Sequence, residues 1–169
     1  GWEYLDENVK QFINDEEFLL VTCHRRENIL NKNSLKNIVD LINSSEKKVL
    51  FPMGYATQRQ IKEFGFNLKD NVLVIDPIGY LEFIYLLKKS QYCISDSGTV
   101  VEEACILNIP SIQMRYSTER PEVYEVGSSI KFDPTLEDHK FEEVHSKADS
   151  LKNTEWSHPF GDGTSSNVI

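Results

Sequence analysis

The feature that most constrains the fold is an alternation of short β-branched runs with longer amphipathic stretches along most of the chain. The apolar runs lack a regular period of two, which is typical of strands that are covered on both faces. Such an alternation favours a parallel sheet whose strands are joined by right-handed helical crossovers. The sequence therefore predicts an α/β fold, a three-layer Rossmann-like parallel sheet formed by one domain over residues 1–169.

The patterns also place the individual elements. Six strands are expected, at residues 18–23, 48–52, 72–75, 92–95, 110–114 and 129–132. Helices are expected at residues 3–12, 35–42, 56–64, 80–87, 98–107 and 136–151. Gly65 and Asn108 stand where two of these helices should end, because both residue types tolerate the left-handed conformation of a helix C-terminus.

Composition excludes several classes of function. The 18 Lys and Arg residues against 27 Asp and Glu give a net charge of −9, which disfavours general nucleic-acid binding. No apolar run approaches the roughly 20 residues of a membrane span, and the acidic start differs from a secretory signal. Three widely spaced cysteines without a CxxC pair suggest neither a disulfide framework nor a zinc site. We expect a cytoplasmic protein without membrane contact, metal or cofactor.

The first candidate site segment follows the first expected strand directly. It runs from Cys23 to Asn28 and contains His24, Arg25 and Glu27. Arginine supplies planar donors for a phosphate or carboxylate, and a neighbouring histidine can donate to a phosphate or a sugar hydroxyl. The alternative is a solvated loop with an incidental Arg–Glu pair, and the residues alone leave both interpretations open.

The second segment carries the expected strand at 92–95 into a helix. Ser97 and Gly98 stand at the turn, where free amides of a first helical turn can bind an anion. Glu103 lies one turn further on, where its carboxylate could accept hydrogen bonds from two ribose hydroxyls. The alternative is simple capping, since Thr99 and Glu102 fit a T-x-x-E capping box.

A third segment, residues 114–122, follows the fifth expected strand and contains Arg120, which could reach a phosphate across the mouth of the sheet. A solvated Arg–Glu loop is the alternative there.

Phe83 fits a core residue at helical spacing. The chain has no GxGxxG, Walker A or GxSxG motif, which disfavours dinucleotide binding, ATP hydrolysis and an α/β-hydrolase. The residues alone predict a phosphate-bearing ligand at the carboxyl edge of a parallel sheet.

Four ordered motifs carry a more specific resemblance. They are His24-Arg25-Arg26-Glu27-Asn28, Asp76-Pro77 with Tyr80-Leu81 and Phe83, Ser95-Asp96-Ser97-Gly98 with Glu102-Glu103, and Thr118-Glu119-Arg120-Pro121-Glu122. In this order the motifs resemble the non-hydrolysing UDP-N-acetylglucosamine 2-epimerases and their relatives that act on other UDP-N-acetyl sugars. The turn Phe160-Gly161-Asp162-Gly163 also fits this family.

The resemblance implies an architecture and a reaction. Members of the family have two Rossmann-like domains facing across a cleft, as in B-type glycosyltransferases, and this chain is similar to the carboxyl-terminal, UDP-binding half, with the amino-terminal domain absent. Their isomerase chemistry removes the C2 proton, expels UDP to a glycal-type intermediate and adds UDP back with C2 inverted. The carboxylates that move the proton belong to the other half, so we expect the isolated chain to be inactive. The full-length enzyme is expected to be a homodimer serving capsule or other surface polysaccharides.

The resemblance also implies roles for particular residues. His24 would be catalytic through its contact with the diphosphate, Phe83 would lie by the uracil, and Glu103 would bind the ribose hydroxyls. The full set of implied UDP-binding residues is His24, Arg25, Phe83, Ser97, Gly98, Thr99, Glu103 and Arg120. The sequence 97–99 reads Ser-Gly-Thr where many members have Ser-Gly-Gly, a variant associated with UDP-N-acetylfucosamine-type relatives, so the sugar stays open.

Two other functions fit the same patterns. One is the donor-binding half of a B-type UDP-sugar glycosyltransferase, which uses similar phosphate-binding turns between strand and helix. The other is a non-catalytic nucleotide-binding module, which would not need to keep His24, Glu103 and Arg120 together. The partners expected in every case are a UDP-sugar or its nucleotide, and for the enzymes the missing amino-terminal domain.

Overall fold

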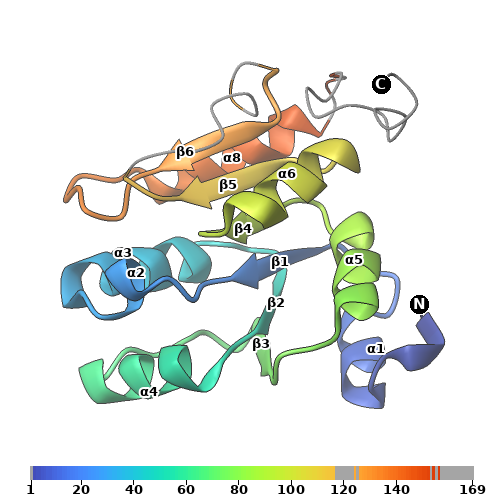
Figure 1. The fold of residues 1–169 in the computed structure, drawn as a ribbon, viewed down its shortest axis with the longest axis horizontal. Helices are drawn as coiled ribbons and strands as arrows, with labels where there is room; N and C mark the ends of the chain where they lie inside the picture. The colour runs from blue at the N-terminus through green and yellow to red at the C-terminus, as the bar shows by residue number, and fades with distance from the viewer. Residues whose placement is uncertain (1, 117–123, 125, 153, 155, 157–169) are drawn as a thin grey trace, which may run out of the picture.

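The computed structural model describes residues 2–116, 124, 126–152, 154 and 156. Its centre is a six-stranded sheet of order β3-β2-β1-β4-β5-β6, in which each strand pairs in parallel with its neighbours (Figure 1). The strands are β1 (Phe18–Thr22), β2 (Lys48–Pro52), β3 (Val72–Ile75), β4 (Cys93–Ser95), β5 (Ser111–Met114) and β6 (Ser129–Phe132). The predicted α/β class and the parallel sheet are confirmed, and each of the six expected strands is present.

Helices cover both faces of the sheet, which gives the three predicted layers (Figure 1). One face packs against α2 (Arg26–Ile29), α3 (Lys32–Asn43), α4 (Tyr55–Phe64) and α8 (Phe141–Leu151). The other packs against α1 (Glu7–Ile13), α5 (Tyr80–Lys89) and α6 (Gly98–Ile106), and the short 3-10 helix η1 (Trp2–Tyr4) precedes α1. Within the described residues, none of these helices combines the length and the apolar character needed to cross a membrane.

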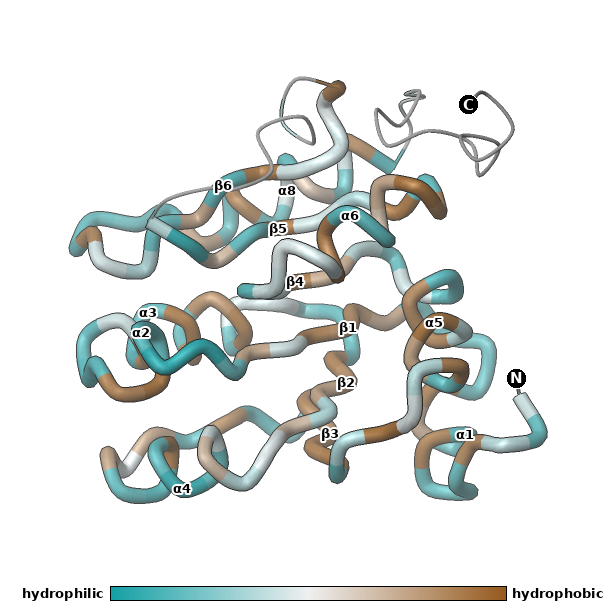
Figure 2. Tube along the Cα trace, in the orientation of Figure 1, coloured by the Kyte–Doolittle hydropathy of each residue, from teal (hydrophilic) through white to brown (hydrophobic). Residues whose placement is uncertain are grey.

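Successive residues of the central strand β1 belong to different cores. Leu19 and Val21 join the cluster under α3 and α4, whereas Phe18 and Leu20 join the cluster under α1 and α5. All four side chains are buried, so both faces of the strand must be apolar. This explains why the run shows no period of two, and Figure 2 shows the central strands mainly in the brown of hydrophobic residues.

The first predicted helix is wrong in its extent. The prediction of one helix over residues 3–12 is replaced by η1 and, after a break, α1. The break lies at Asp6, whose extended backbone (φ −65°, ψ 150°) forms the N-cap of α1, and its carbonyl accepts hydrogen bonds from the amides of Val9 and Lys10. Aspartate favours this position over a helix interior.

The last predicted helix begins five residues later than expected, at Phe141 instead of 136. Asp133 forms a turn in the segment before this helix. Its carboxylate accepts hydrogen bonds from the amide (2.9 Å) and the hydroxyl (2.6 Å) of Thr135. Its carbonyl accepts from the amide of Leu136, which forms a turn. Local bonds of this kind favour turns over helix.

The sheet order reverses direction between β1 and β4. The crossovers from β1 lead away to β2 and β3, and those from β4 lead the opposite way to β5 and β6. The two strands pair with Leu20 beside Cys93 and Thr22 beside Ser95, so they end together. In open parallel sheets, ligands bind outside the carboxyl ends of the strands at such a switch point. The first two predicted site segments follow these two strands.

Candidate functional site

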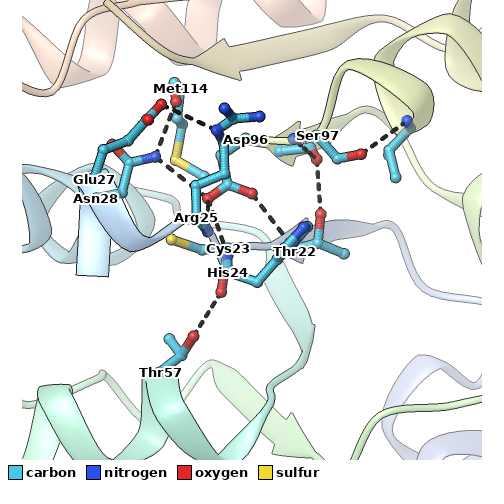
Figure 3. Close-up of polar contacts among 12 residues, drawn as sticks. Thr22, Cys23, His24, Arg25, Glu27, Asn28, Thr57, Asp96, Ser97 and Met114 are labelled. Carbon is cyan, nitrogen blue, oxygen red and sulfur yellow. Dashed lines mark hydrogen bonds and ion pairs between the residues drawn. The ribbon is translucent and has the colours of Figure 1, made fainter. Parts of the chain in front are cut away.

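A fully buried carboxylate, Asp96, lies between the two segments that follow β1 and β4 (Figure 3). Its Oδ2 accepts hydrogen bonds from the backbone amides of His24 at 2.9 Å and Arg25 at 2.8 Å. It also accepts from Nδ2 of Asn28 at 3.3 Å, and the same Nδ2 donates to the carbonyl of Met114 at 3.1 Å. One side chain after β4 therefore fixes the backbone after β1, and Asn28 links both to the end of β5.

The imidazole of His24 stands at the solvent side of this carboxylate. Its Nδ1 lies 3.4 Å from Oδ1 of Asp96, while 65% of the side chain is exposed. A histidine oriented by a carboxylate through one nitrogen keeps the other nitrogen available to a ligand. The short helix α2, which was not expected from the sequence, begins two residues later at Arg26 and turns the chain away from the edge.

The turn into α6 is organised by hydroxyl groups. Ser95 Oγ lies 2.7 Å from Thr22 Oγ1 across the β1–β4 pair and accepts a hydrogen bond from the amide of Ser97 at 3.0 Å. Ser97 is the N-cap of α6, and its Oγ accepts from the amide of Val100 at a long 3.4 Å. The capping-box interpretation of Thr99 with Glu102 is therefore wrong, because the N-cap is Ser97, two residues earlier, and its Oγ accepts from the third amide of the helix.

The cap leaves part of the helix N-terminus available. The amides of Gly98 and Thr99, the first two residues of α6, have no hydrogen-bond partner in the described part of the chain. Free amides at a helix N-terminus, together with the helix dipole, favour an anion. Ser97, Gly98 and Thr99 thus lie where the phosphate hypothesis needs them, on the edge that also carries His24.

Glu103 lies one turn into α6 and is partly buried. Its Oε1 accepts a hydrogen bond of 3.1 Å from the hydroxyl of Tyr80, the first residue of α5. This bond to a carboxylate raises the pKa of the Tyr80 hydroxyl. The contact joins two helices on the same face of the sheet and was not predicted from the sequence.

A pocket of about 270 Å³ opens beside His24. Its lining comes from the carboxyl ends of β1 and β2 and from the segment that leads into α5, and consists of Thr22, Cys23, His24, Pro52, Gly54, Pro77, Ile78 and Phe83. Phe83 is partly buried and also packs on the core under α5. Phe83 is therefore both a core residue, as its helical spacing indicated, and part of the lining of this pocket.

Arg25 and Glu27 form the surface pair that the alternative interpretation anticipated, with Nε of Arg25 3.0 Å from Oε1 of Glu27. The arginine side chain is 32% exposed, so it lies at the rim of the loop. Arg120, predicted to reach a phosphate, lies outside the described residues, as do the other members of the 118–122 motif and the 160–163 turn.

The thiol next to the histidine is not a nucleophile. Cys23 is buried, and burial, followed by the nearby Asp96 carboxylate, raises its pKa well above the ordinary value. A thiol in that state stays protonated at neutral pH. No group of three or more metal-ligating side chains occurs in the part of the chain that the structure describes. The site therefore offers amides, hydroxyls, a histidine and a carboxylate, which suit a phosphorylated ribose.

Asp96 and Tyr80 stand in the motifs that carry the resemblance, but neither was given a role at the site from the sequence. A charged residue directly after a buried strand was the available signal for Asp96, since such a carboxylate needs several donors. Tyr80 carried no comparable signal, because an aromatic residue at a helix start also fits a surface or core position.

Comparison with known proteins agrees with the motifs. The family model described as UDP-N-acetylglucosamine 2-epimerase matches residues 3–169. The UDP-N-acetylglucosamine 2-epimerase of Methanocaldococcus jannaschii is 40% identical over 97% of this chain and 47% of its own length. The chain thus spans about half the length of the curated relatives that it matches.

Solved structures give the same result. The structure of UDP-GlcNAc 2-epimerase from Methanocaldococcus jannaschii superposes with a TM-score of 0.79 at 37% identity, covering 95% of this chain and 47% of that one. A second structure of the enzyme from this organism, in complex with UDP-GlcNAc and UDP, has a TM-score of 0.75 at 37% identity over 94% of this chain and 46% of that one.

A glycosyltransferase, that of kitacinnamycin, is similar in fold alone, with a TM-score of 0.59 at 13% identity over 82% of this chain and 35% of that one. The Rossmann-like fold is thus shared with glycosyltransferases, whereas the epimerase from Methanocaldococcus jannaschii is similar in both sequence and fold. From the match over residues 3–169 and the 40% identity, the chain belongs to the UDP-N-acetylglucosamine 2-epimerase family.

Proposed function

We propose that this chain is the UDP-binding half of a UDP-N-acetylhexosamine 2-epimerase that supplies precursors of surface polysaccharides. The observation that carries the proposal is the junction at the switch point, where buried Asp96 holds the His24 loop beside the N-terminus of α6 in a chain of this family. The related structure that contains UDP-GlcNAc and UDP supports the ligand class.

The diphosphate would bind between the loop and the helix. The amides of Gly98 and Thr99 and the hydroxyl of Ser97 are donors at a positive helix end, which favours an anion. The Ser97 hydroxyl accepts from Val100 and keeps its own proton to donate. His24 would contact the diphosphate from the opposite side, with its Nδ1 facing Asp96 at 3.4 Å.

The nucleoside would extend to the partly apolar side of the same edge. Glu103 would accept hydrogen bonds from the two ribose hydroxyls, since a carboxylate has free lone pairs on both oxygens. Phe83 would lie by the uracil in the pocket that it shares with His24, where a flat base can contact an aromatic ring.

The reaction expected of the whole enzyme breaks the bond between C1 of the sugar and the UDP oxygen while the C2 proton leaves. UDP then adds back to the glycal-type intermediate as the proton returns to the opposite face of C2. This half would contribute by stabilising the negative charge on the departing diphosphate, which is catalysis as well as binding. The proton-moving groups are expected on the other half, so the 169-residue chain should bind UDP without turnover.

Titration of the chain with UDP by calorimetry, with UMP and ADP as comparison ligands, tests the proposal. We expect UDP to bind more tightly than both, because UMP lacks the second phosphate and ADP lacks uracil. Glu103→Ala should weaken UDP binding by about 1–3 kcal/mol, the range for a lost hydrogen bond to a charged group. Glu63→Ala, an exposed carboxylate on α4, is the matched control and should leave the affinity unchanged. Equal affinity for UDP and ADP, or no effect of Glu103→Ala, would contradict the proposal.

A further inference from the structure

The contact between Tyr80 and Glu103 is not explained by the packing of the fold. Tyr80 is 65% exposed, and its helix α5 is anchored to the core by other residues, Leu86 and Leu87, which are fully buried. The hydroxyl nevertheless donates to Oε1 of Glu103 at 3.1 Å instead of facing only water. An exposed phenol that contributes little to the core is held against one particular carboxylate.

That carboxylate is the one proposed to bind the ribose. A glutamate side chain has three rotatable bonds, and ordering a flexible side chain on binding has an entropic cost. The bond from Tyr80 restrains Glu103 before any ligand arrives, and it occupies only one lone pair of Oε1. Oε2 and the second lone pair of Oε1 stay available for two vicinal hydroxyls.

We propose that Tyr80 is a positioning residue that holds Glu103 for the two ribose hydroxyls and so favours a ribonucleotide over its 2′-deoxy analogue. The proposal rests on the proposed function, in which Glu103 binds the ribose. The hydrogen bond to the carboxylate also raises the pKa of the Tyr80 hydroxyl above its ordinary value, which favours the protonated, donating form of the phenol.

Calorimetric affinities for UDP and 2′-deoxy-UDP, measured for the wild-type chain and for Tyr80→Phe, test this role. Tyr80→Phe removes the hydroxyl and keeps the ring. We expect its dissociation constant for UDP to rise roughly three- to tenfold, as for the loss of one pre-ordered side chain. The effect on 2′-deoxy-UDP should be smaller, because that ligand has one hydroxyl fewer on Glu103, so the preference for UDP falls.

The control is Tyr85→Phe, which removes a hydroxyl from the same helix. That hydroxyl has no hydrogen-bond partner among the described residues. The centre of the Tyr85 ring lies 5.8 Å from Nζ of Lys89. Affinities for both nucleotides should equal those of the wild type. Far-UV circular dichroism of all variants confirms that a change in affinity is not a change in folding.

A double-mutant cycle with Glu103→Ala separates an action through Glu103 from a direct contact with the ligand. If Tyr80 acts through Glu103, Tyr80→Phe has no further effect in the Glu103→Ala chain; an additive effect would overturn the proposal. An unchanged preference for UDP in Tyr80→Phe would overturn it too, while leaving the proposed function intact. Absence of UDP binding by the wild-type chain would overturn both.

Discussion

Replacing Asp96 by alanine removes the acceptor for three nitrogen donors. These are the amides of His24 and Arg25, at 2.9 and 2.8 Å, and Nδ2 of Asn28 at 3.3 Å. A buried donor left without a partner costs about 1–3 kcal/mol. Asn28 keeps its bond to the Met114 carbonyl, and water can reach the exposed His24, so the cost is smaller than the sum over three unpaired donors. We expect the free energy of unfolding to fall by about 2–4 kcal/mol.

Asp96→Asn should have an intermediate effect. The amide oxygen still accepts from the two backbone amides, but a hydrogen bond to a neutral acceptor contributes about 0.5–1.5 kcal/mol against about 1.5–3 for a charged one. The new NH₂ group would face Nδ1 of His24 in place of Oδ1, so the ring loses its negative partner. UDP affinity should therefore decrease in Asp96→Asn even where most of the stability is kept.

Urea unfolding followed by far-UV circular dichroism, with linear extrapolation, measures these differences. Asp40→Asn is the control, because Asp40 forms an exposed helical pair with Lys36 at 2.7 Å and such pairs contribute no more than about 0.5 kcal/mol. The reasoning is refuted if Asp96→Ala is no more destabilised than this control, or if Asp96→Asn is as stable as the wild type with unchanged UDP affinity.

Two further predictions concern buried groups. His145 contacts the Tyr92 hydroxyl (2.6 Å) and the Leu41 carbonyl (2.7 Å), and burial lowers its pKa below the usual 6.5. As the pH falls, the unfolded chain binds a proton at this histidine before the folded chain does. The free energy of unfolding should therefore be at its full value above pH 6.5 and decrease below it, less steeply in His145→Gln. Parallel pH curves of the urea midpoints of the two proteins would contradict this. Burial also raises the pKa of Cys93 to about 12. The native protein should react negligibly with Ellman's reagent until urea exposes its three buried thiols, Cys23, Cys93 and Cys105. Rapid reaction without urea would contradict this, because it would show that a thiol is accessible.

Much of the fold could be predicted from the sequence because strands covered on both faces must be apolar throughout. The runs at 48–52 and 72–75 were predicted with the observed bounds. Helix ends marked by a conformational requirement were also predicted: Gly65 has φ 74° and Asn108 φ 60°. Two errors fell at Asp6 and Asp133, because aspartate favours helix caps and turns over helix interiors, and the short helix α2 was not predicted.

The candidate site could be predicted only in outline. The position of His24 and Ser97 follows from local order, since each comes after a strand that ends at the same edge. Asp96 and the Tyr80–Glu103 contact depend on pairing between distant residues, and local patterns carry no information about such partners. At the start of α6, Thr99 matched a capping motif, yet Ser97 is the N-cap because its hydroxyl lies at the turn and accepts from the amide of Val100.

The strand order has a consequence for how the protein folds. Pairing of β1 with β4 joins Leu20 to Cys93, whereas the other pairings join residues much closer in sequence, such as Phe18 with Lys48 or Cys93 with Ser111. Closing the longer loop has the larger entropic cost and slows folding. Two three-stranded units can therefore form by local pairing before the sheet is joined. The junction that holds Asp96 against the His24 loop forms only at the joining step, so nucleotide binding would report completion of folding and not merely the presence of secondary structure.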